Sequence, residues 1–261
     1  MCAILGLILD YFSYMKKVEI ININDDINIF FARNCFSEKI NRCLCEDKYH
    51  TSIKYSEFLE NRDDDKIGEY IEEILGNRVF FNCNNTIRES LIDCIFELFE
   101  NAYFHGKANY IYTCGQFFPK KEKLIFSIVD FGKTIPENVL KKEFFSQDCE
   151  CIDWAMGYQN STKELVNGYP GGSGLFLLEK FIGERNGWLQ IVSRKGIYEK
   201  RFNNDTIIYK DDLLYGFPGT VITFCIEYKD NGISYIQATE EENIDKIINE
   251  LFRSDIYGES N

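Results

Sequence analysis

The longest helical pattern in the sequence carries a line of polar residues that its apolar spacing does not require. Apolar side chains recur at helical intervals over residues 86–103, so this segment is predicted to be a helix. Glu97 and Asn101 lie four positions apart and project from one face, and Asp93 and His105 extend the same line. Such a line is either a solvated helix face or one wall of a binding site, and the helix alone does not decide between them.

Helical and strand-like patterns follow one another along the rest of the chain and predict an α+β fold. β-Branched and apolar runs predict strands at residues 18–23, 110–114, 124–130, 189–193 and 221–228. Helical spacing predicts further helices at residues 3–14, 27–33, 67–75, 173–182 and 240–252. Residues 116–123 are expected to form a hairpin connection, and the polar residues 201–213 are expected to lie outside the strands.

The composition disfavours two classes of partner. The chain of 261 residues has a formal net charge of -13. A surface this acidic repels phosphate backbones and anionic lipid head groups, so no nucleic acid and no membrane are expected as partners. The apolar segment 1–14 carries Asp10, lacks the basic region of a signal peptide and is too short to span a bilayer. We therefore expect a cytoplasmic protein.

Ten cysteines are present, and we expect them to be reduced. A domain of this size builds its core without disulfides, and a cytoplasmic location keeps thiols reduced. A zinc site formed by Cys43, Cys45 and His50 is an alternative, although the C-x-C spacing differs from the C-x-x-C of structural zinc sites. The other interpretation is that these cysteines are ordinary buried or half-buried thiols.

A carboxylate stands at the end of an apolar strand pattern. Asp130 ends the pattern, Gly132 follows two positions later, and the segment Thr134-Ile135-Pro136 comes next. Such an aspartate can accept a hydrogen bond from an exocyclic amine, and such a glycine lets a flat ring approach the backbone. The same residues also suit an ordinary strand-end turn.

A glycine-rich segment, YPGGSGL at residues 169–175, opens the helix predicted at residues 173–182. Glycines at a helix start expose unpaired N–H groups at the positive end of the helix dipole, which favours phosphate. The segment lacks the G-K-[ST] ending of a P-loop and the G-x-G-x-x-G fingerprint of a Rossmann site. Taken alone, it also suits an ordinary glycine-rich helix entry.

The order of these motifs resembles that of the GHKL superfamily of gyrase, heat-shock chaperone, histidine-kinase and mismatch-repair ATPases. The shared order is an acid–amide helix, a strand with Asp-x-Gly, a long variable segment, a glycine-rich helix start and Gly219-Thr220 before the strand VITFCI. The resemblance covers about residues 85–230. It implies an α+β fold, a two-layer α/β sandwich of the Bergerat type, that binds ATP and Mg²⁺.

Five segments resemble a narrower group, the stand-alone bacterial ATP-binding proteins similar to histidine-kinase and anti-sigma-factor ATPase domains. These segments are ENAYFHG, YTCGQFFPKKEKLIFSIVDFG, AMGYQNSTK, YPGGSGLFLLEKFI and FPGTVITFCI. Such proteins often carry an N-terminal segment with a STAS-like fold. Residues 1–36 resemble the last helix-strand-helix part of one, without the preceding strands. The resemblance thus divides the chain into a small α/β segment at 1–80 and an ATP-binding domain at 81–261.

The resemblance implies a role for each matching residue. Glu97 matches the carboxylate that activates water or a phosphoryl acceptor, and Asn101 matches the Mg²⁺ ligand. Asp130 matches the adenine-binding aspartate, with Gly132 beside the ring, and Ile135 is a further expected cofactor-binding residue. Thr220 matches a threonine that reaches adenine through water, and the phosphate-facing turn matches Gly172, Ser173, Gly174 and Leu175.

The segment between the strand and the glycine-rich helix start matches the ATP lid of the family, a segment that closes on nucleotide. It spans about residues 136–170. Lys163 lies near its end and is expected either to reach the γ-phosphate or to be an exposed lysine. Two residues depart from the family pattern. Thr134 replaces the second glycine of D-x-G-x-G, and Phe176 replaces the last glycine of the phosphate motif.

Four functions are compatible with these features. The first is an ATP-binding regulatory protein with slow ATPase activity that controls a protein partner through lid closure. The second is a serine kinase of the anti-sigma-factor type that acts on a STAS-like partner. The third is an orphan catalytic domain of a histidine kinase, and the fourth is a non-catalytic nucleotide-binding scaffold. The apolar helix at residues 3–14 suggests a contact surface, including that of a homodimer.

Overall fold

The computed structural model describes residues 1–13, 18, 20, 21, 23–59, 61–76, 85–160, 162 and 174–228. All structural statements below refer to these residues, which fall within one compact unit, Met1–Lys229. Three predicted site residues, Lys163, Gly172 and Ser173, lie outside the described residues, as does the helix predicted at 240–252.

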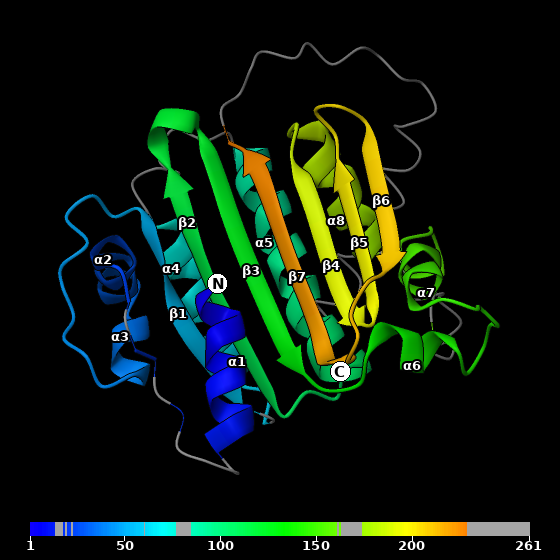
Figure 1. Cartoon of the computed structure of the whole chain (residues 1–261). Helices are drawn as coiled ribbons and strands as arrows, with labels where there is room; N and C mark the ends of the chain where they lie inside the picture. The colour runs from blue at the N-terminus through cyan, green and yellow to red at the C-terminus, as the bar shows by residue number, and fades with distance from the viewer. Residues whose placement is uncertain are drawn as a thin grey trace, which may run out of the picture. The chain divides into compact units, whose positions relative to one another are not determined.

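A seven-stranded sheet in which every pair of neighbours is antiparallel forms the centre of this unit (Figure 1). The strand order is β1-β2-β3-β7-β4-β5-β6. The strands are β1 (Ser52–Leu59), β2 (Tyr110–Phe118), β3 (Lys123–Phe131), β4 (Trp188–Arg194), β5 (Gly196–Arg201), β6 (Thr206–Asp211) and β7 (Phe217–Glu227). The predicted α+β class is confirmed.

Eight α-helices accompany the sheet in the described part of the chain. They are α1 (Cys2–Ser13), α2 (Asp25–Arg33), α3 (Phe36–Lys39), α4 (Asp64–Leu75), α5 (Asn85–Glu100), α6 (Ile135–Val139), α7 (Asp148–Ala155) and α8 (Gly174–Glu184). Local sequence explains where some of them begin. The Asp63 carboxylate accepts the Lys66 N–H at 3.0 Å and caps α4, while Thr134 and Glu137 form a capping box at the start of α6.

The main core lies between one face of the sheet and the helices α4, α5 and α8, which stand behind the sheet in Figure 1. Fully buried side chains of α5, such as Leu91, Ile95 and Leu98, meet strand residues such as Phe126 and Phe224. This burial removes the apolar positions of α5 from solvent and leaves its other face available for the polar line.

The opposite face of the sheet is covered by α1, which crosses β2 and β3 in front of the sheet (Figure 1). Cys2, Ala3 and Leu7 of α1 are buried there against Val129 and Val221. A two-layer arrangement was predicted, and α1 adds a partial third layer because its apolar side chains need a surface to cover. None of the helices in the described part of the chain has the length and apolar character needed to cross a bilayer.

The strand predictions need correction at four places, one of which is β5, an unpredicted strand that pairs with β4 and β6. Val18, Ile20, Ile21 and Ile23 belong to no strand, and Ile20 and Ile23 instead pack on the α1 cluster. Strand β1 was not predicted, although it pairs with β2 along one edge of the sheet. The polar stretch 201–213 contains β6, which pairs with β5 as the other edge strand. The edge strands β1 and β6 carry charged side chains, which obscure the alternation of apolar and polar residues that predicts a strand.

Candidate functional site

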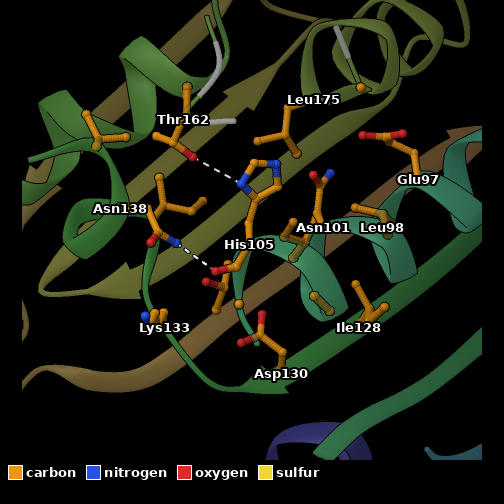
Figure 2. Close-up of a pocket in the computed structure, with 18 of the residues that line it drawn as sticks. Glu97, Leu98, Asn101, His105, Ile128, Asp130, Lys133, Asn138, Thr162 and Leu175 are labelled. Atoms are coloured by element: carbon orange, nitrogen blue, oxygen red, sulfur yellow. Dashed lines mark hydrogen bonds between the residues drawn. The ribbon is translucent and has the colours of Figure 1, made fainter. Parts of the chain in front are cut away.

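A cavity lies where several elements meet (Figure 2), and its empty space, with the open solvent at its mouth included, is about 830 Å³. Its walls come from α5 and the turn after it, the ends of β3 and β7, the segment from α6 to residue 162, and the start of α8. Seven predicted site residues line it: Glu97, Asn101, Asp130, Ile135, Gly174, Leu175 and Thr220. The structure thus brings together motifs that are separated by up to 123 residues in the sequence (97 to 220).

The polar line predicted on the long helix forms one wall of this cavity. Glu97, Asn101 and His105 all line it, and Figure 2 shows the Asn101 and His105 side chains pointing into the same space. The last turn, Asn101–His105, is a π-helix in which the Gly106 N–H donates to the Asn101 carbonyl at 3.0 Å. Such wide turns recur at functional sites because they shift side chains around the helix axis.

Asp130 lies buried at the end of β3, directly opposite Thr220 of β7. Burial raises the pKa of the Asp130 carboxyl to about 8, and the backbone N–H of Thr220 acts in the opposite direction. Its Oδ1 atom has no hydrogen-bond partner among the described residues, and neither has the Nδ2 atom of Asn101. Buried polar atoms without partners are rare, and both of these lie in the wall of one cavity.

The hydroxyl groups of Thr220 and Ser193 link β7, β4 and α6. Ser193 Oγ lies 3.0 Å from Thr220 Oγ1 and donates to the Gly219 carbonyl at 3.2 Å. The Ile135 N–H, at the start of α6, donates to Ser193 Oγ at 2.9 Å. Both Thr220 and Ile135 were predicted as site residues, and Ser193 is the missed residue that holds them together.

Gly174, the first residue of α8, lies directly against Glu97. A Cβ atom at residue 174 would overlap the Glu97 carboxylate, so any side chain there would displace the Glu97 side chain from its present position. The positive end of the α8 dipole therefore faces the cavity together with a carboxylate from α5.

Gly132 does not line this cavity. A Cβ atom at residue 132 would overlap the Gly106 carbonyl, and the Lys133 N–H donates to the same carbonyl at 2.5 Å. The glycine thus allows the β3 end to approach the turn after α5, whereas the sequence interpretation placed it beside a ring. Gly106 occupies the position next to the aspartate, since a Cβ there would lie 3.2 Å from Asp130 Oδ1.

The two residues that depart from the GHKL pattern lie outside the cavity lining. Thr134 is buried and caps α6. Phe176 packs on Tyr158, with ring centroids 5.2 Å apart. Neither side chain therefore narrows the space between Asn101 and Asp130.

Sequence reasoning missed the outer wall of the cavity, most of which belongs to the segment interpreted as a lid. Lys133, Asn138, Trp154 and Thr162 line this wall. Asn138 Nδ2 donates to the His105 carbonyl at 2.8 Å, and Thr162 Oγ1 lies 3.0 Å from His105 Nδ1 (Figure 2). No local pattern marks these positions.

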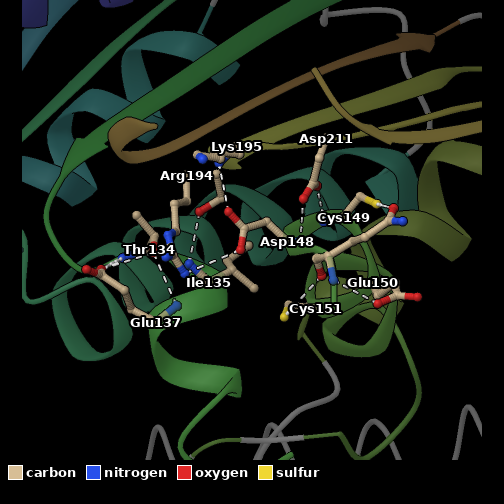
Figure 3. A network of polar contacts seen from close by, with 12 residues as sticks. Thr134, Ile135, Glu137, Asp148, Cys149, Glu150, Cys151, Arg194, Lys195 and Asp211 are labelled. Carbon is tan, nitrogen blue, oxygen red and sulfur yellow. Dashed lines mark hydrogen bonds and ion pairs between the residues drawn. The ribbon is translucent and has the colours of Figure 1, made fainter. Parts of the chain in front are cut away.

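The helix α7, within the predicted lid, is attached to the sheet by a polar network (Figure 3). The backbone N–H groups of Asp148 and Cys149 donate to the Asp211 carboxylate of β6 at 2.9 and 2.8 Å. The Asp148 carboxylate in turn accepts the Lys195 N–H at 3.0 Å. Since Ile152 of α7 is also fully buried, movement of α7 as part of a lid would break all of these contacts.

Among the described residues, no three histidine, cysteine or acidic side chains lie close enough together to hold a metal ion. Cys43, Cys45 and His50 are all exposed, so the zinc alternative gains no support. A magnesium ion that takes its remaining ligands from phosphates and water does not require such a cluster.

No known protein-family model matches the chain, and no curated protein matches it.

Proposed function

We propose that the chain binds Mg-ATP in this cavity, in the manner of the GHKL superfamily, and uses it as a slow ATPase that controls a protein partner. The observation that carries the proposal is a pair of buried polar atoms, Asp130 Oδ1 and Asn101 Nδ2, that have no hydrogen-bond partner among the described residues and belong to residues lining one cavity with the start of α8. The polar groups of a ligand would supply the missing hydrogen bonds.

The Asp130 end of the cavity suits a purine. A buried carboxyl group with a free oxygen can accept a hydrogen bond from the exocyclic amine of adenine, and this donor would favour the ionised carboxylate. Apolar side chains next to it, such as Ile128 and Ile222, offer flat-ring contacts. The hydroxyl of Thr220 stands across the strand pair and can hold a bridging water.

The opposite end suits phosphates and a magnesium ion. The helix α8 presents its N-terminus at Gly174, and Asn101 and Glu97 offer the hard oxygen atoms that Mg²⁺ prefers. Asn101 would hold the ion, which would neutralise part of the phosphate charge. Lys133 is the one lysine or arginine among the described lining residues. Because the protein as a whole is acidic, a bound magnesium ion would have to neutralise much of the phosphate charge.

Glu97 is the candidate catalytic base. Its carboxylate would take a proton from a water molecule as that oxygen attacks the γ-phosphorus, while the bond from phosphorus to the bridging oxygen breaks and ADP leaves. A serine hydroxyl of a STAS-like partner would replace the water in the kinase alternative. In both reactions Glu97 would take a proton from the oxygen that attacks the γ-phosphorus.

Calorimetric titration with ATP, with and without Mg²⁺, tests the proposal. We expect wild type to bind ATP, Asp130→Ala to lose most of the affinity, and the exposed-site control Asp212→Ala to bind like wild type. Absence of binding by wild type would refute the nucleotide site. The fate of a labelled γ-phosphate then separates the reactions. Free phosphate indicates an ATPase, label on a partner indicates a kinase, and unreacted ATP indicates a scaffold.

A further inference from the structure

A second cavity lies at the β1 edge of the sheet and shares no lining residue with the proposed nucleotide site (Figure 1). It is lined by the end of α2, the loop before β1, the start of β1 and the C-terminal part of α4. Its empty space, with the open solvent at its mouth included, is about 1040 Å³. The buried side chains of Ile53, Tyr70 and Ile74 belong to this lining and give it an apolar part.

The loop before β1 holds the Asp47 carboxylate in the wall of this cavity. The Oδ2 atom of Asp47 accepts the N–H groups of Thr51 and Ser52 at 2.8 and 2.7 Å. The other carboxylate oxygen, Oδ1, is buried and has no hydrogen-bond partner among the described residues. The loop therefore fixes the carboxylate through one oxygen and leaves the second oxygen without a donor.

Arg33, the last residue of α2, brings the opposite charge to the same wall. Its Nε atom is also buried and has no hydrogen-bond partner in the described part of the chain. No ion pair there joins Arg33 to Asp47, whereas the exposed Lys54 and Glu73 of this lining pair with each other at 2.6 Å. Buried charged groups without partners are costly, so Arg33 and Asp47 are the groups of this cavity that most need a ligand.

The chemistry of these two side chains defines the ligand. A guanidinium group pairs with a carboxylate, and a carboxylate oxygen accepts a hydrogen bond from an ammonium group. The basic residues Arg33 and Lys54 balance the acidic residues Asp47 and Glu73 in the lining, so the cavity favours a ligand without net charge. A free α-amino acid carries both charged groups, whereas each end of a polypeptide carries only one of them.

We propose that this cavity binds a free α-amino acid with an apolar side chain. The carboxylate of the amino acid pairs with Arg33, and its ammonium group donates to Asp47. Its side chain contacts the apolar part of the lining, which is formed by Ile53, Tyr70 and Ile74. This site is separate from the proposed nucleotide site and does not depend on it.

Calorimetric titration of wild type with L-leucine, L-isoleucine, L-valine, L-methionine and L-phenylalanine tests the proposal. We expect at least one of these amino acids to bind, with one molecule per chain. Two analogues of the amino acid that binds best then test the charged groups, and for L-leucine these are isocaproate, which lacks the ammonium group, and isoamylamine, which lacks the carboxylate. Each analogue should bind about tenfold more weakly or worse, because one charge-assisted hydrogen bond is missing.

Two substitutions separate the charged contacts. Arg33→Met keeps an unbranched side chain without the charge, so it should weaken binding of the amino acid about tenfold and leave binding of the amine analogue unchanged. Asp47→Asn keeps an oxygen for the Thr51 and Ser52 N–H groups but places an N–H₂ group at the free position. It should weaken binding of the amino acid about tenfold and leave binding of the carboxylate analogue unchanged.

Lys48→Met and Asp65→Asn are matched controls, because both residues are exposed and neither lines the cavity. Both variants should bind the amino acid like wild type. Circular dichroism melting identifies a variant that fails to fold, and the comparison of the amino acid with its two analogues, which needs only wild type, then decides.

Three results would overturn the inference: no binding of any of the five amino acids by wild type, an analogue that binds as tightly as its amino acid, or full affinity in both Arg33→Met and Asp47→Asn. The nucleotide site is tested independently by the ATP titration. Asp130→Ala, which should lose ATP binding, should bind the amino acid like wild type, because Asp130 does not line this cavity.

Discussion

Gly174 begins α8 so close to Glu97 that any side chain at residue 174 would overlap the Glu97 carboxylate. The glycine that begins α8 is thus also the residue that makes room for the proposed base. The start of α8 and the carboxylate of Glu97 are in direct contact, although 77 positions separate them in the sequence (97 to 174).

Gly174→Ala should lower ATP turnover with little change in stability. The methyl group displaces the Glu97 side chain, while the gain in helix propensity, up to about 1 kcal/mol, offsets part of the strain. Gly68→Ala in α4 is the control, since a Cβ there meets nothing within 4 Å. It should stabilise the protein by up to about 1 kcal/mol and leave turnover unchanged. Steady-state phosphate release and urea unfolding measure the two effects.

Glu97→Gln should reduce turnover by about 10²–10⁴-fold and leave ATP affinity intact, because the carboxylate acts on the attacking water. Glu89→Gln, an exposed position on the same helix, should behave like wild type. Single-turnover phosphate release and calorimetry give the comparison. Equal losses of affinity and turnover in Glu97→Gln would assign this residue to binding.

Asn101→Ala should remove the magnesium dependence of nucleotide binding, whereas Asn101→Asp should keep it, because aspartate retains a hard oxygen. The backbone bond from Gly106 to residue 101 survives both changes. The exposed Asn109→Ala serves as control. Titrations at several Mg²⁺ concentrations test this, and an unchanged dependence in Asn101→Ala would place the ion elsewhere.

The stability of the ligand-free protein should depend on the protonation of Asp130. Its folded-state pKa, about 8, lies above the unfolded value of 3.8, so the folded state binds the extra proton between these values. The carboxyl group therefore lowers the free energy of unfolding as pH rises through this window, by at most about 1.4 kcal/mol per pH unit. Urea unfolding from pH 5 to 8 should show a flatter profile for Asp130→Asn, and parallel profiles would contradict the shift.

Asp211→Ala should destabilise the protein by about 1–2 kcal/mol, because two backbone N–H groups of α7 lose their acceptor. The carboxylate of its exposed neighbour Asp212 accepts a hydrogen bond from the Lys210 side chain at 2.6 Å and contacts no backbone N–H group among the interactions resolved in the described residues. Asp212→Asn should therefore change stability by less than about 1 kcal/mol. Urea unfolding compares the two variants. Equal losses of stability would show that the Asp211 cap on α7 contributes no more to the free energy of unfolding than the exposed Asp212.

The parts of the site that could be predicted from the sequence have local signals. The spacing of Glu97 and Asn101 follows from helix geometry, and Asp130 ends a strand whose apolar run is unmistakable. Glycine at 174 marks a helix start in the sequence and in the structure. The conformation at these positions is set by residues close in the sequence, so it can be predicted without a structure.

The rest depends on contacts between distant residues or on weak patterns. His105 and Thr162 are 57 positions apart, and nothing near either of them indicates the other. Strand β1 was missed because Ile53 and Phe58 are its only fully buried residues. The packing of Gly132 against Gly106, 26 positions earlier, could likewise only be identified after folding.

The strand order also has a consequence for synthesis on the ribosome. Strand β7 lies between β3 and β4, and it alone connects β1–β3 with β4–β6 in the sheet, yet it is translated after all of them. A nascent chain that stops before residue 217 therefore holds two half-sheets with open edges, which favour association with other chains. The facing pair Asp130 and Thr220 comes together in the step that joins these halves, so a growing polypeptide acquires the proposed nucleotide site only when the sheet closes.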